Sequence, residues 1–273
     1  MTGEWNIEAV DLDAYLDRIG QPKPPKPPKQ PKSREEPSAA ALSRLAQAHV
    51  EAIPFENVDV VLGRHRGIEL DVVSEKLVGR RRGGYCYEQA GLFAAVAERL
   101  GYRVQRTVAR VQPRKSGPYT HMTLVITAEG RDFLVDVGFG AGILVPMPLV
   151  DGAVVDQAGW PHRMVRRDGW WVLQKDGEDL HEFLPQVHSR PLDYQVFHHY
   201  TSTHPKSPFT GRLVVMRLEQ GRFRRMLGRE YQESRPDGTV DTRIIDPVDL
   251  GKTLEDLDIV LTGEELAALL ERY

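Results

Sequence analysis

The chain of 273 residues carries a formal net charge of −3 and has a pI near 6.3, which excludes a strong basic field for nucleic acid. Its single cysteine excludes an internal disulfide and is typical of a reducing compartment. No apolar run approaches the length of a membrane span and no signal peptide is visible, so we expect a soluble, cytoplasmic protein with no membrane or nucleic-acid partner.

A short amphipathic helix is the first element that the sequence predicts. Gly20 ends its pattern, and the apolar residues at helical spacing are Leu12, Tyr15, Leu16 and Ile19. Residues 21–33 are rich in proline and lysine, which excludes a helix or a central strand, and we expect a solvated insertion there rather than a docking ligand. A second helix is predicted over residues 39–52, and Pro54 stops it.

Cys86 lies at the predicted start of a third helix. It follows Gly83 and Gly84, and a helical pattern continues from it to Leu100, where Gly101 ends it. The unpaired N–H groups at a helix N-terminus favour a thiolate. Lowering a thiol pKa from about 8.5 to roughly 6 requires about 3.4 kcal/mol, whereas a helix terminus supplies roughly 2 kcal/mol. A reactive cysteine here therefore also needs an imidazolium, and a small buried thiol without chemistry is the alternative.

A predicted β-hairpin downstream supplies a histidine and a carboxylate. Residues 121–127 and 132–137 have the pattern of strands, and a two- or four-residue loop between them sets the register. In that register one face is apolar and becomes the core side, and the other face holds His121, Thr123, Asp136 and Gly138. His121 and Asp136 are then diagonal neighbours within reach of each other. With Cys86 they are candidates for a Cys–His–carboxylate triad, and their order fits a papain-like catalytic core topology.

Short strands dominate the middle of the chain. They include residues 104–111 and 169–175 and suggest a small β-barrel. The last part mixes strands with a helix from Gly263, for which Thr262 and Glu265 form a capping box. We therefore expect an α+β fold with an N-terminal helical bundle that carries the nucleophile, a central β-barrel that carries the histidine and the aspartate, and a C-terminal α/β lid. The predicted domain limits are 1–101, 102–200 and 201–273.

Several short blocks of the chain carry a family resemblance. They are Ile53-Pro54-Phe55-Glu56-Asn57, Arg82-Gly83-Gly84-Tyr85-Cys86-Tyr87-Glu88, Thr120-His121, Asp136-Val137-Gly138-Phe139-Gly140 and Ser202-Thr203-His204-Pro205-Lys206-Ser207-Pro208-Phe209. In these blocks, and in their order, the chain resembles the arylamine N-acetyltransferases. It departs from the family at residues 21–33, where a short loop is usual, and at Glu88-Gln89-Ala90, where many bacterial members have Glu-His-Asn.

The resemblance implies a ping-pong acetyl transfer. The Cys86 thiolate would take an acetyl group from the co-substrate acetyl-CoA, and an arylamine, a hydrazine or an N-hydroxyarylamine would then receive it. His121 would pair with Cys86 and shuttle protons, and Asp136 would orient and charge-stabilise His121. Backbone N–H groups near Cys86 are candidates for the oxyanion hole.

The same resemblance assigns residues around the substrates. Phe55, Phe139 and Phe209 would line the acyl and arylamine pocket, and Thr120 and Gly140 would lie beside the entering cofactor. No metal is expected, because the histidines near residue 200 lack a metal-ligand spacing.

Other functions stay open or lose support. An amide synthase that releases or cyclises a polyketide by intramolecular amide formation would use an identical triad. A non-catalytic adaptor would have no need of an intact triad, and a papain-like protease or a transglutaminase-like enzyme fits neither the Phe55 nor the Phe139 block. The sequence leaves open the acceptor amine, the acyl chain length and the oligomeric state.

Overall fold

The structure, a computed structural model, describes residues 3–22, 37–115, 117–187 and 189–272. Most of the predicted Pro/Lys-rich insertion therefore lies outside the described residues. Within these ranges no helix combines the length and the apolar character needed to cross a membrane. The helices are α1 (Leu12–Arg18), α2 (Ala39–Ala52), α3 (Val58–Val61), α4 (Leu70–Ser74), α5 (Cys86–Arg99), α6 (Pro191–Thr203), α7 (Leu250–Asp256) and α8 (Gly263–Leu270).

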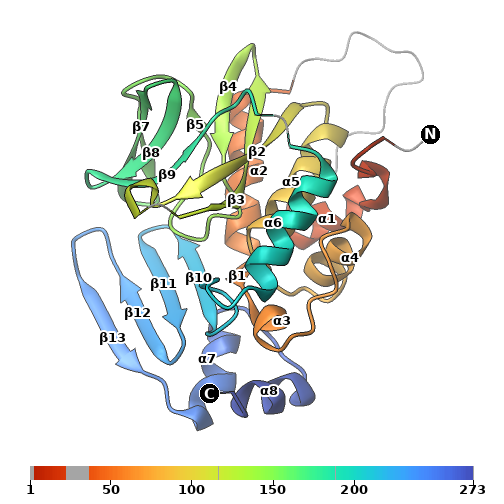
Figure 1. Cartoon of the computed structure of the whole chain (residues 1–273), viewed down its shortest axis with the longest axis vertical. Coiled ribbons are helices and arrows are strands. Elements are labelled where there is room, and N and C mark those ends of the chain that lie inside the picture. Colours follow the sequence, from red (N-terminus) through yellow and green to blue (C-terminus); the bar gives the residue numbers. More distant parts are fainter. Residues whose placement is uncertain (1–2, 23–36, 116, 188, 273) are drawn as a thin grey trace.

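Two antiparallel sheets accompany these helices (Figure 1). The strands of the first, in spatial order, are β5 (Met147–Pro148), β4 (Arg131–Val135), β3 (Tyr119–Ala128), β2 (Arg103–Val111), β9 (Glu178–Phe183), β8 (Trp170–Lys175), β7 (Trp160–Arg167) and β6 (Val154–Gln157). Those of the second are β1 (Phe55–Glu56), β10 (Val214–Glu219), β11 (Arg222–Leu227), β12 (Glu230–Ser234) and β13 (Val240–Ile244). The first sheet is nearly closed and barrel-like, so the predicted α+β class is confirmed.

The N-terminal helices begin and end where local signals place them. Ser38 caps α2 through a hydrogen bond from the Ala41 N–H to its Oγ at 3.1 Å, and α2 has the predicted bounds. Gly20 takes a left-handed φ of +66° after α1, as a helix stop requires. Helix α5 is buried on most of its surface, with Leu92 and Phe93 fully enclosed. The helix that begins at the cysteine is thus part of the N-terminal core.

The hairpin of β3 and β4 has the predicted register. Leu124 pairs with Val135 and Thr127 with Asp132, across a two-residue turn at residues 129 and 130 that both have positive φ. The apolar face packs in the same core as α5. The opposite face is also enclosed, because Val125 and Leu134 belong to a second core inside the barrel-like sheet. The hairpin therefore holds its catalytic candidates between two hydrophobic layers.

The second sheet includes one strand from the N-terminal part of the chain, β1. β1 pairs with β10, with Phe55 opposite Met216. Helices α7 and α8 pack below this sheet (Figure 1) on a separate apolar core. The predicted capping box of α8 is confirmed: the Thr262 Oγ1 accepts from the Glu265 N–H at 3.2 Å, and the Glu265 carboxylate accepts from the Thr262 N–H at 2.8 Å. The domain limits stay a prediction.

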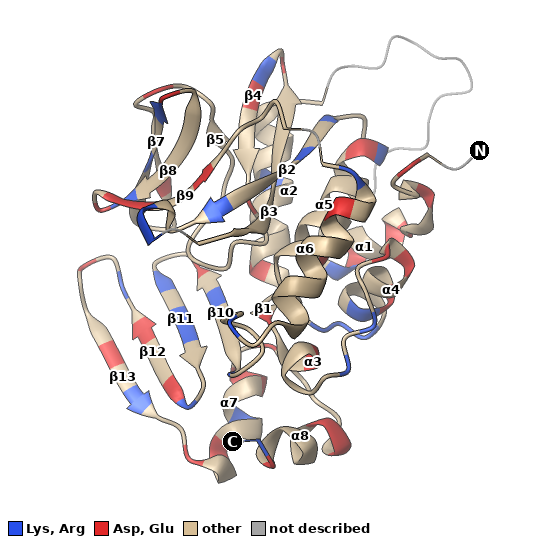
Figure 2. Cartoon of the chain, in the orientation of Figure 1, with Lys and Arg blue, Asp and Glu red and all other residues tan. Residues whose placement is uncertain are grey.

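Charged residues pair across the strands of the second sheet. β11 is basic and the adjacent β12 carries two glutamates (Figure 2). Arg222 lies 2.6 Å from the Glu233 carboxylate, and Arg224 lies 2.7 Å from that of Glu219. These pairs link neighbouring strands or turns, as opposite charges on facing strands do.

Candidate active site

Cys86 begins α5 and is only 3% exposed. The loop before it lies against residues 54–56: the Gly84 N–H donates to the Pro54 carbonyl, and the Glu56 N–H donates to the Gly84 carbonyl. A Cβ on Gly83 would collide with that same Pro54 carbonyl oxygen. The Gly-Gly pair therefore allows the backbone contact that sets the cysteine at the helix start.

His121 and Asp136 meet as the hairpin register predicts. The His121 Nε2 lies 2.8 Å from Asp136 Oδ1 and 3.0 Å from Oδ2, and both side chains are buried. The Cys86 sulfur is close enough to the His121 ring to help raise the pKa of that ring. A Cβ on Gly138 would lie 2.9 Å from the Cys86 backbone, so this glycine lets the loop after Asp136 pack on the cysteine. Cys86, His121 and Asp136, which are far apart in sequence, thus form one continuous cluster.

The charges in this cluster stabilise each other. Burial alone would lower the pKa of His121, but the Asp136 carboxylate beside it raises that pKa well above its usual value. Burial would raise the pKa of Asp136, and the hydrogen bonds and positive charge of His121 hold it far below its usual range. The imidazolium is therefore the favoured form of His121 at neutral pH, as thiolate chemistry requires.

A second histidine, which the sequence analysis missed, contacts the same carboxylate. His181 on β9 is fully buried, and its Nε2 lies 2.8 Å from Asp136 Oδ2. Burial lowers the pKa of His181, so its ring is neutral and donates from Nε2. Its Nδ1 has no hydrogen-bond partner among the described residues. The ring lies 5.0 Å from that of Phe139 and 5.8 Å from that of Phe183.

The three groups His121, Asp136 and His181 have the composition of a metal site, with ligand atoms within 4.8 Å of one another. Both histidine nitrogens, however, lie 2.8 Å from carboxylate oxygens, which is the distance of a direct hydrogen bond. The geometry is that of one carboxylate accepting from two rings.

The residues predicted to surround the substrates gather beside the triad. The Phe55 and Phe209 rings lie 5.9 Å apart, and Gly140 lies against the Phe55 ring. The Phe139 ring lies 5.0 Å from that of His121. The backbone carbonyl of Thr120 accepts from the Tyr87 hydroxyl at 2.9 Å and lies 3.9 Å from the Cys86 sulfur. Phe139 and Thr120 thus lie next to triad members. Phe55 contacts Phe209 and Gly140, and the two phenylalanines also contact the residues just before Cys86.

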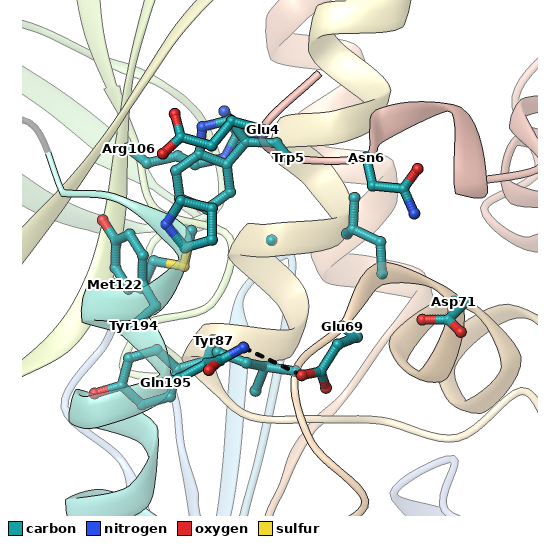
Figure 3. A pocket seen from close by; sticks show the side chains of 14 residues that line it. Glu4, Trp5, Asn6, Glu69, Asp71, Tyr87, Arg106, Met122, Tyr194 and Gln195 are labelled. Carbon is teal, nitrogen blue, oxygen red and sulfur yellow. Dashed lines mark hydrogen bonds between the residues drawn. The ribbon is translucent and has the colours of Figure 1, made fainter. Parts of the chain in front are cut away.

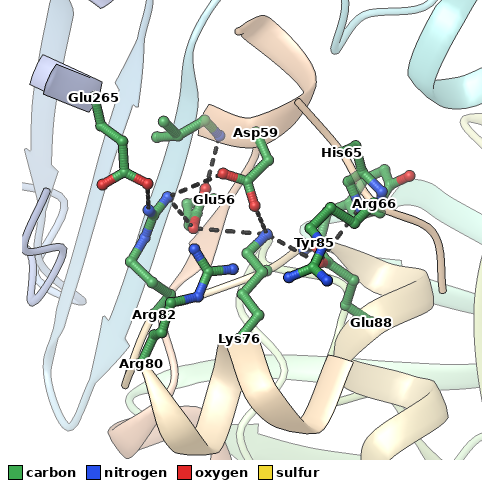
Figure 4. Close-up of polar contacts among 12 residues, drawn as sticks. Glu56, Asp59, His65, Arg66, Lys76, Arg80, Arg82, Tyr85, Glu88 and Glu265 are labelled. Atoms are coloured by element: carbon green, nitrogen blue, oxygen red, sulfur yellow. Dashed lines mark hydrogen bonds and ion pairs between the residues drawn. The ribbon is translucent and has the colours of Figure 1, made fainter. Parts of the chain in front are cut away.

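A buried network of ion pairs holds residues 82–85, the loop that precedes Cys86 (Figure 4). Lys76 is 3% exposed, and its Nζ lies 2.8 Å from Glu88 and 3.0 Å from Asp59. Arg82, also 3% exposed, lies 2.9 Å from Glu56 and 3.0 Å from Glu265 of α8. The Glu88 carboxylate also accepts from the Tyr85 N–H at 3.0 Å. The network therefore joins the loop, α5 and the C-terminal helix.

Comparison with known proteins places this site in a family. Residues 38–266 match the family model described as N-acetyltransferase. An arylamine N-acetyltransferase of Mycobacterium tuberculosis is 36% identical over 262 residues, which cover 91% of this chain and 88% of the relative. The chain belongs to the arylamine N-acetyltransferase family.

Solved structures of this family share the fold. The arylamine N-acetyltransferase of Nocardia farcinica is 38% identical, with a TM-score of 0.86 over 97% of this chain and 95% of that one. The arylamine N-acetyltransferase of Mycobacterium marinum, solved in complex with CoA, is 31% identical, with a TM-score of 0.84 over 96% of this chain and 99% of that one. The predicted family and enzyme class are therefore confirmed.

Proposed function

We propose that this chain transfers an acetyl group from acetyl-CoA to an arylamine or arylhydrazine through an acetyl-cysteine intermediate on Cys86. The observation that carries the proposal is the 2.8 Å hydrogen bond between His121 and Asp136, with Cys86 close enough to His121 to help raise the pKa of its ring. Membership of the arylamine N-acetyltransferase family and the CoA bound to a relative of the same fold support the choice of substrates.

In the first half-reaction the Cys86 thiolate attacks the thioester carbonyl of acetyl-CoA. A carbon–sulfur bond to Cys86 forms, the bond to the CoA sulfur breaks, and the His121 imidazolium gives its proton to the leaving thiolate. In the second half-reaction the amine nitrogen attacks the acetyl-cysteine carbonyl. Neutral His121 takes the proton from nitrogen, the Cys86 thiolate leaves, and the thiolate–imidazolium pair is restored.

Asp136 supports both half-reactions because its carboxylate fixes the orientation of the His121 ring and stabilises the imidazolium. His181 acts through Asp136 as a positioning residue. It donates a second hydrogen bond at 2.8 Å, which fixes the carboxylate and favours its ionised form.

The aromatic residues beside the triad suit a planar acceptor. In this proposal Phe55, Phe139 and Phe209 line the acyl and arylamine pocket, and Thr120 and Gly140 lie next to the entering acetyl-CoA. The support for it is the closeness of Phe139 to His121 and of Thr120 to Cys86, and the contact of the Phe55 and Phe209 rings with each other.

Mass spectrometry of the intact protein and its peptides tests the proposal. Incubation with acetyl-CoA alone is expected to add one acetyl group, located on Cys86, and a simple arylamine is expected to remove it with release of the N-acetylated amine. Cys86→Ser is the control that should carry no thioester. An acetylated protein that no arylamine or hydrazine discharges would reject the acceptor class, and an amide synthase with the same triad would then be favoured. No acetyl group on Cys86 would reject the mechanism.

A further inference from the structure

An open cavity of 370 Å³ lies between the N-terminal segment and helices α4, α5 and α6 (Figure 3). This volume lies within the range of small-molecule sites. Met122 lines the cavity and follows His121 on β3. Successive side chains of a strand point to opposite faces, so the cavity lies behind the strand that presents His121 to Cys86. None of Cys86, His121 and Asp136 lines it.

The walls of the cavity are aromatic. Trp5, Tyr87 and Tyr194 line it, together with the sulfur-containing side chain of Met122 (Figure 3). The Trp5 and Tyr194 rings lie 5.8 Å apart, and the Tyr87 and Tyr194 rings lie 6.4 Å apart. Rings set at such distances offer faces and edges that favour a further flat ring.

The charge at the cavity is negative. The exposed carboxylates of Glu4, Glu69 and Asp71 lie around it (Figure 3). Glu4 pairs with Arg190 at 3.6 Å, and Glu69 accepts a hydrogen bond from Gln195 at 3.3 Å. Asp71 has no ion-pair partner within the described ranges. At least two carboxylates therefore face the cavity without a neutralising cation.

The arginine that lines the cavity, Arg106, already forms an ion pair with Glu98. Arg106 forms two hydrogen bonds with the Glu98 carboxylate, at 2.9 and 2.7 Å. Its guanidinium also lies 4.2 Å from the centroid of the Trp5 ring. The same indole thus holds one planar cation on its face, which is the contact that a cationic ligand would use.

Gly91 gives an independent indication that the space is kept open. It lies inside α5 and lines the cavity. Glycine in a helix interior is less stable than alanine. A Cβ built on Gly91 would meet no atom within 4 Å, in contrast to Gly138, where it would meet the Cys86 backbone. Packing therefore gives no reason for glycine at position 91, and what its missing side chain provides is room in the cavity.

We propose that this cavity binds a planar aromatic cation at a site distinct from the catalytic cleft. The aromatic walls select a flat ring, and the carboxylates of Glu69 and Asp71 select a positive charge. This site does not depend on the acetyl transfer proposed above, so binding can be measured without turnover.

Isothermal titration calorimetry of the full chain tests the proposal. The probe is N-methylquinolinium, which has no amino group to acetylate, and the matched neutral probe is quinoline at a pH where it is uncharged. We expect the cation to bind at least tenfold more tightly than quinoline. Equal affinities for the two probes would overturn the selection for charge.

Filling the cavity from Gly91 should remove the site without unfolding the protein. Gly91→Leu is expected to weaken N-methylquinolinium binding at least tenfold while the Tm stays equal or rises, because leucine is a better helix former. Gly263→Leu in α8, where an added Cβ also meets no atom, is the matched control and should bind as the wild type does. If Gly91→Leu fails to fold, Gly91→Ala replaces it, with a smaller loss expected. Wild-type affinity in the folded Gly91 variant would overturn the proposal.

Two further variants locate the bound probe. The double variant Glu69→Gln/Asp71→Asn should weaken N-methylquinolinium binding about fivefold or more and leave quinoline binding unchanged. Phe209→Ala, whose ring contacts Tyr85 just before Cys86 and does not line the cavity, should leave both affinities unchanged. Loss of binding in Phe209→Ala with retention in the double variant would assign the probe to the catalytic cleft and contradict the proposal.

Discussion

Two buried polar clusters flank the start of α5, and they differ in how their charges are balanced. Around Lys76 and Arg82, each cation faces two or more carboxylates, which come from β1, α3, α5 and α8. Around Asp136, one carboxylate serves two rings, and one of these rings also contacts the thiol.

This difference in charge balance indicates which of the two clusters can take part in a reaction. The ion pairs of Lys76 and Arg82 with carboxylates hold a backbone in place, and this cluster contains no nucleophile. The Asp136 cluster contains a thiol and an imidazole whose proton can move. We therefore expect changes in the first cluster to act on stability and changes in the second to act on rate.

The largest effect on rate is expected from Cys86→Ser. Acetyl transfer should fall by more than about 10⁴-fold, because the hydroxyl is not ionised by a neighbouring imidazole as a thiol is. The side chain is small and nearly isosteric, so the Tm should stay close to that of the wild type. Stopped-flow or steady-state release of CoA measures the rate. Turnover at the wild-type level would remove Cys86 from the mechanism.

Asp136→Asn should lower the rate by roughly 10³- to 10⁴-fold, the scale seen when other triads lose their carboxylate charge. Without that charge, burial dominates and the pKa of His121 falls, so the imidazolium is lost at neutral pH. The rate of Cys86 alkylation by iodoacetamide against pH measures this. At neutral pH the wild type should react faster than the variant, because only the wild type keeps His121 protonated beside the sulfur. Identical profiles would contradict the ion pair.

Lys76→Met tests the other cluster. Removing one partner of a buried ion network leaves carboxylates unpaired, and the free energy of unfolding should fall by about 3–5 kcal/mol, as measured in urea. The activity per folded molecule should change far less than in Asp136→Asn. Lys252→Met, at the exposed pair with Asp256, is the matched control and should leave the urea midpoint in place. A loss of activity without loss of stability would reverse the assignment of the two clusters.

The same variant has a signature in pH. Lys76 and hydrogen bonds hold the pKa of Glu88 at about 2 against burial, below the usual value of about 4.3. Because the folded pKa is depressed, this stabilisation is complete above about pH 4.3 and is lost as the pH falls toward 2. In Lys76→Met the pKa of Glu88 should rise, so acid unfolding should begin at a higher pH than in the wild type.

Local signals in the sequence predicted much of what positions the cysteine. The end of α2 follows from a proline stop, and the hairpin register follows from a short loop whose parity fixes both faces. Once that register is known, His121 and Asp136 must meet. These features depend on neighbours in sequence, which is why pattern and spacing suffice for them.

Contacts between residues far apart in the chain had no local sequence signal from which they could be predicted. The strand β1 is only two residues long, so no hydrophobic periodicity predicts it, and it pairs with β10 about 160 residues later in the chain. The Arg82–Glu265 pair joins the cysteine loop to the last helix in the same way. His181 lies on a strand with ordinary alternation between Asp179 and Phe183, and only the pairing of β9 with β2 brings it to Asp136. A histidine in the inward row of a barrel-like strand was the one available hint.

His181 therefore gives the finest test of the comparison. His181→Phe keeps the ring volume among Phe139 and Phe183 but removes the hydrogen bond to Asp136, and acetylation of Cys86 should slow by roughly 10- to 100-fold, as for other groups that orient a catalytic residue through a hydrogen bond. The Asp136 pKa should rise because one stabilising donor is gone, so the acidic limb of the kcat/KM profile should move to higher pH. His181→Gln, whose amide can donate from nearly the same place, should recover most of the rate and the wild-type profile. A slow His181→Phe with an unshifted profile and no recovery in His181→Gln would assign the residue to packing alone.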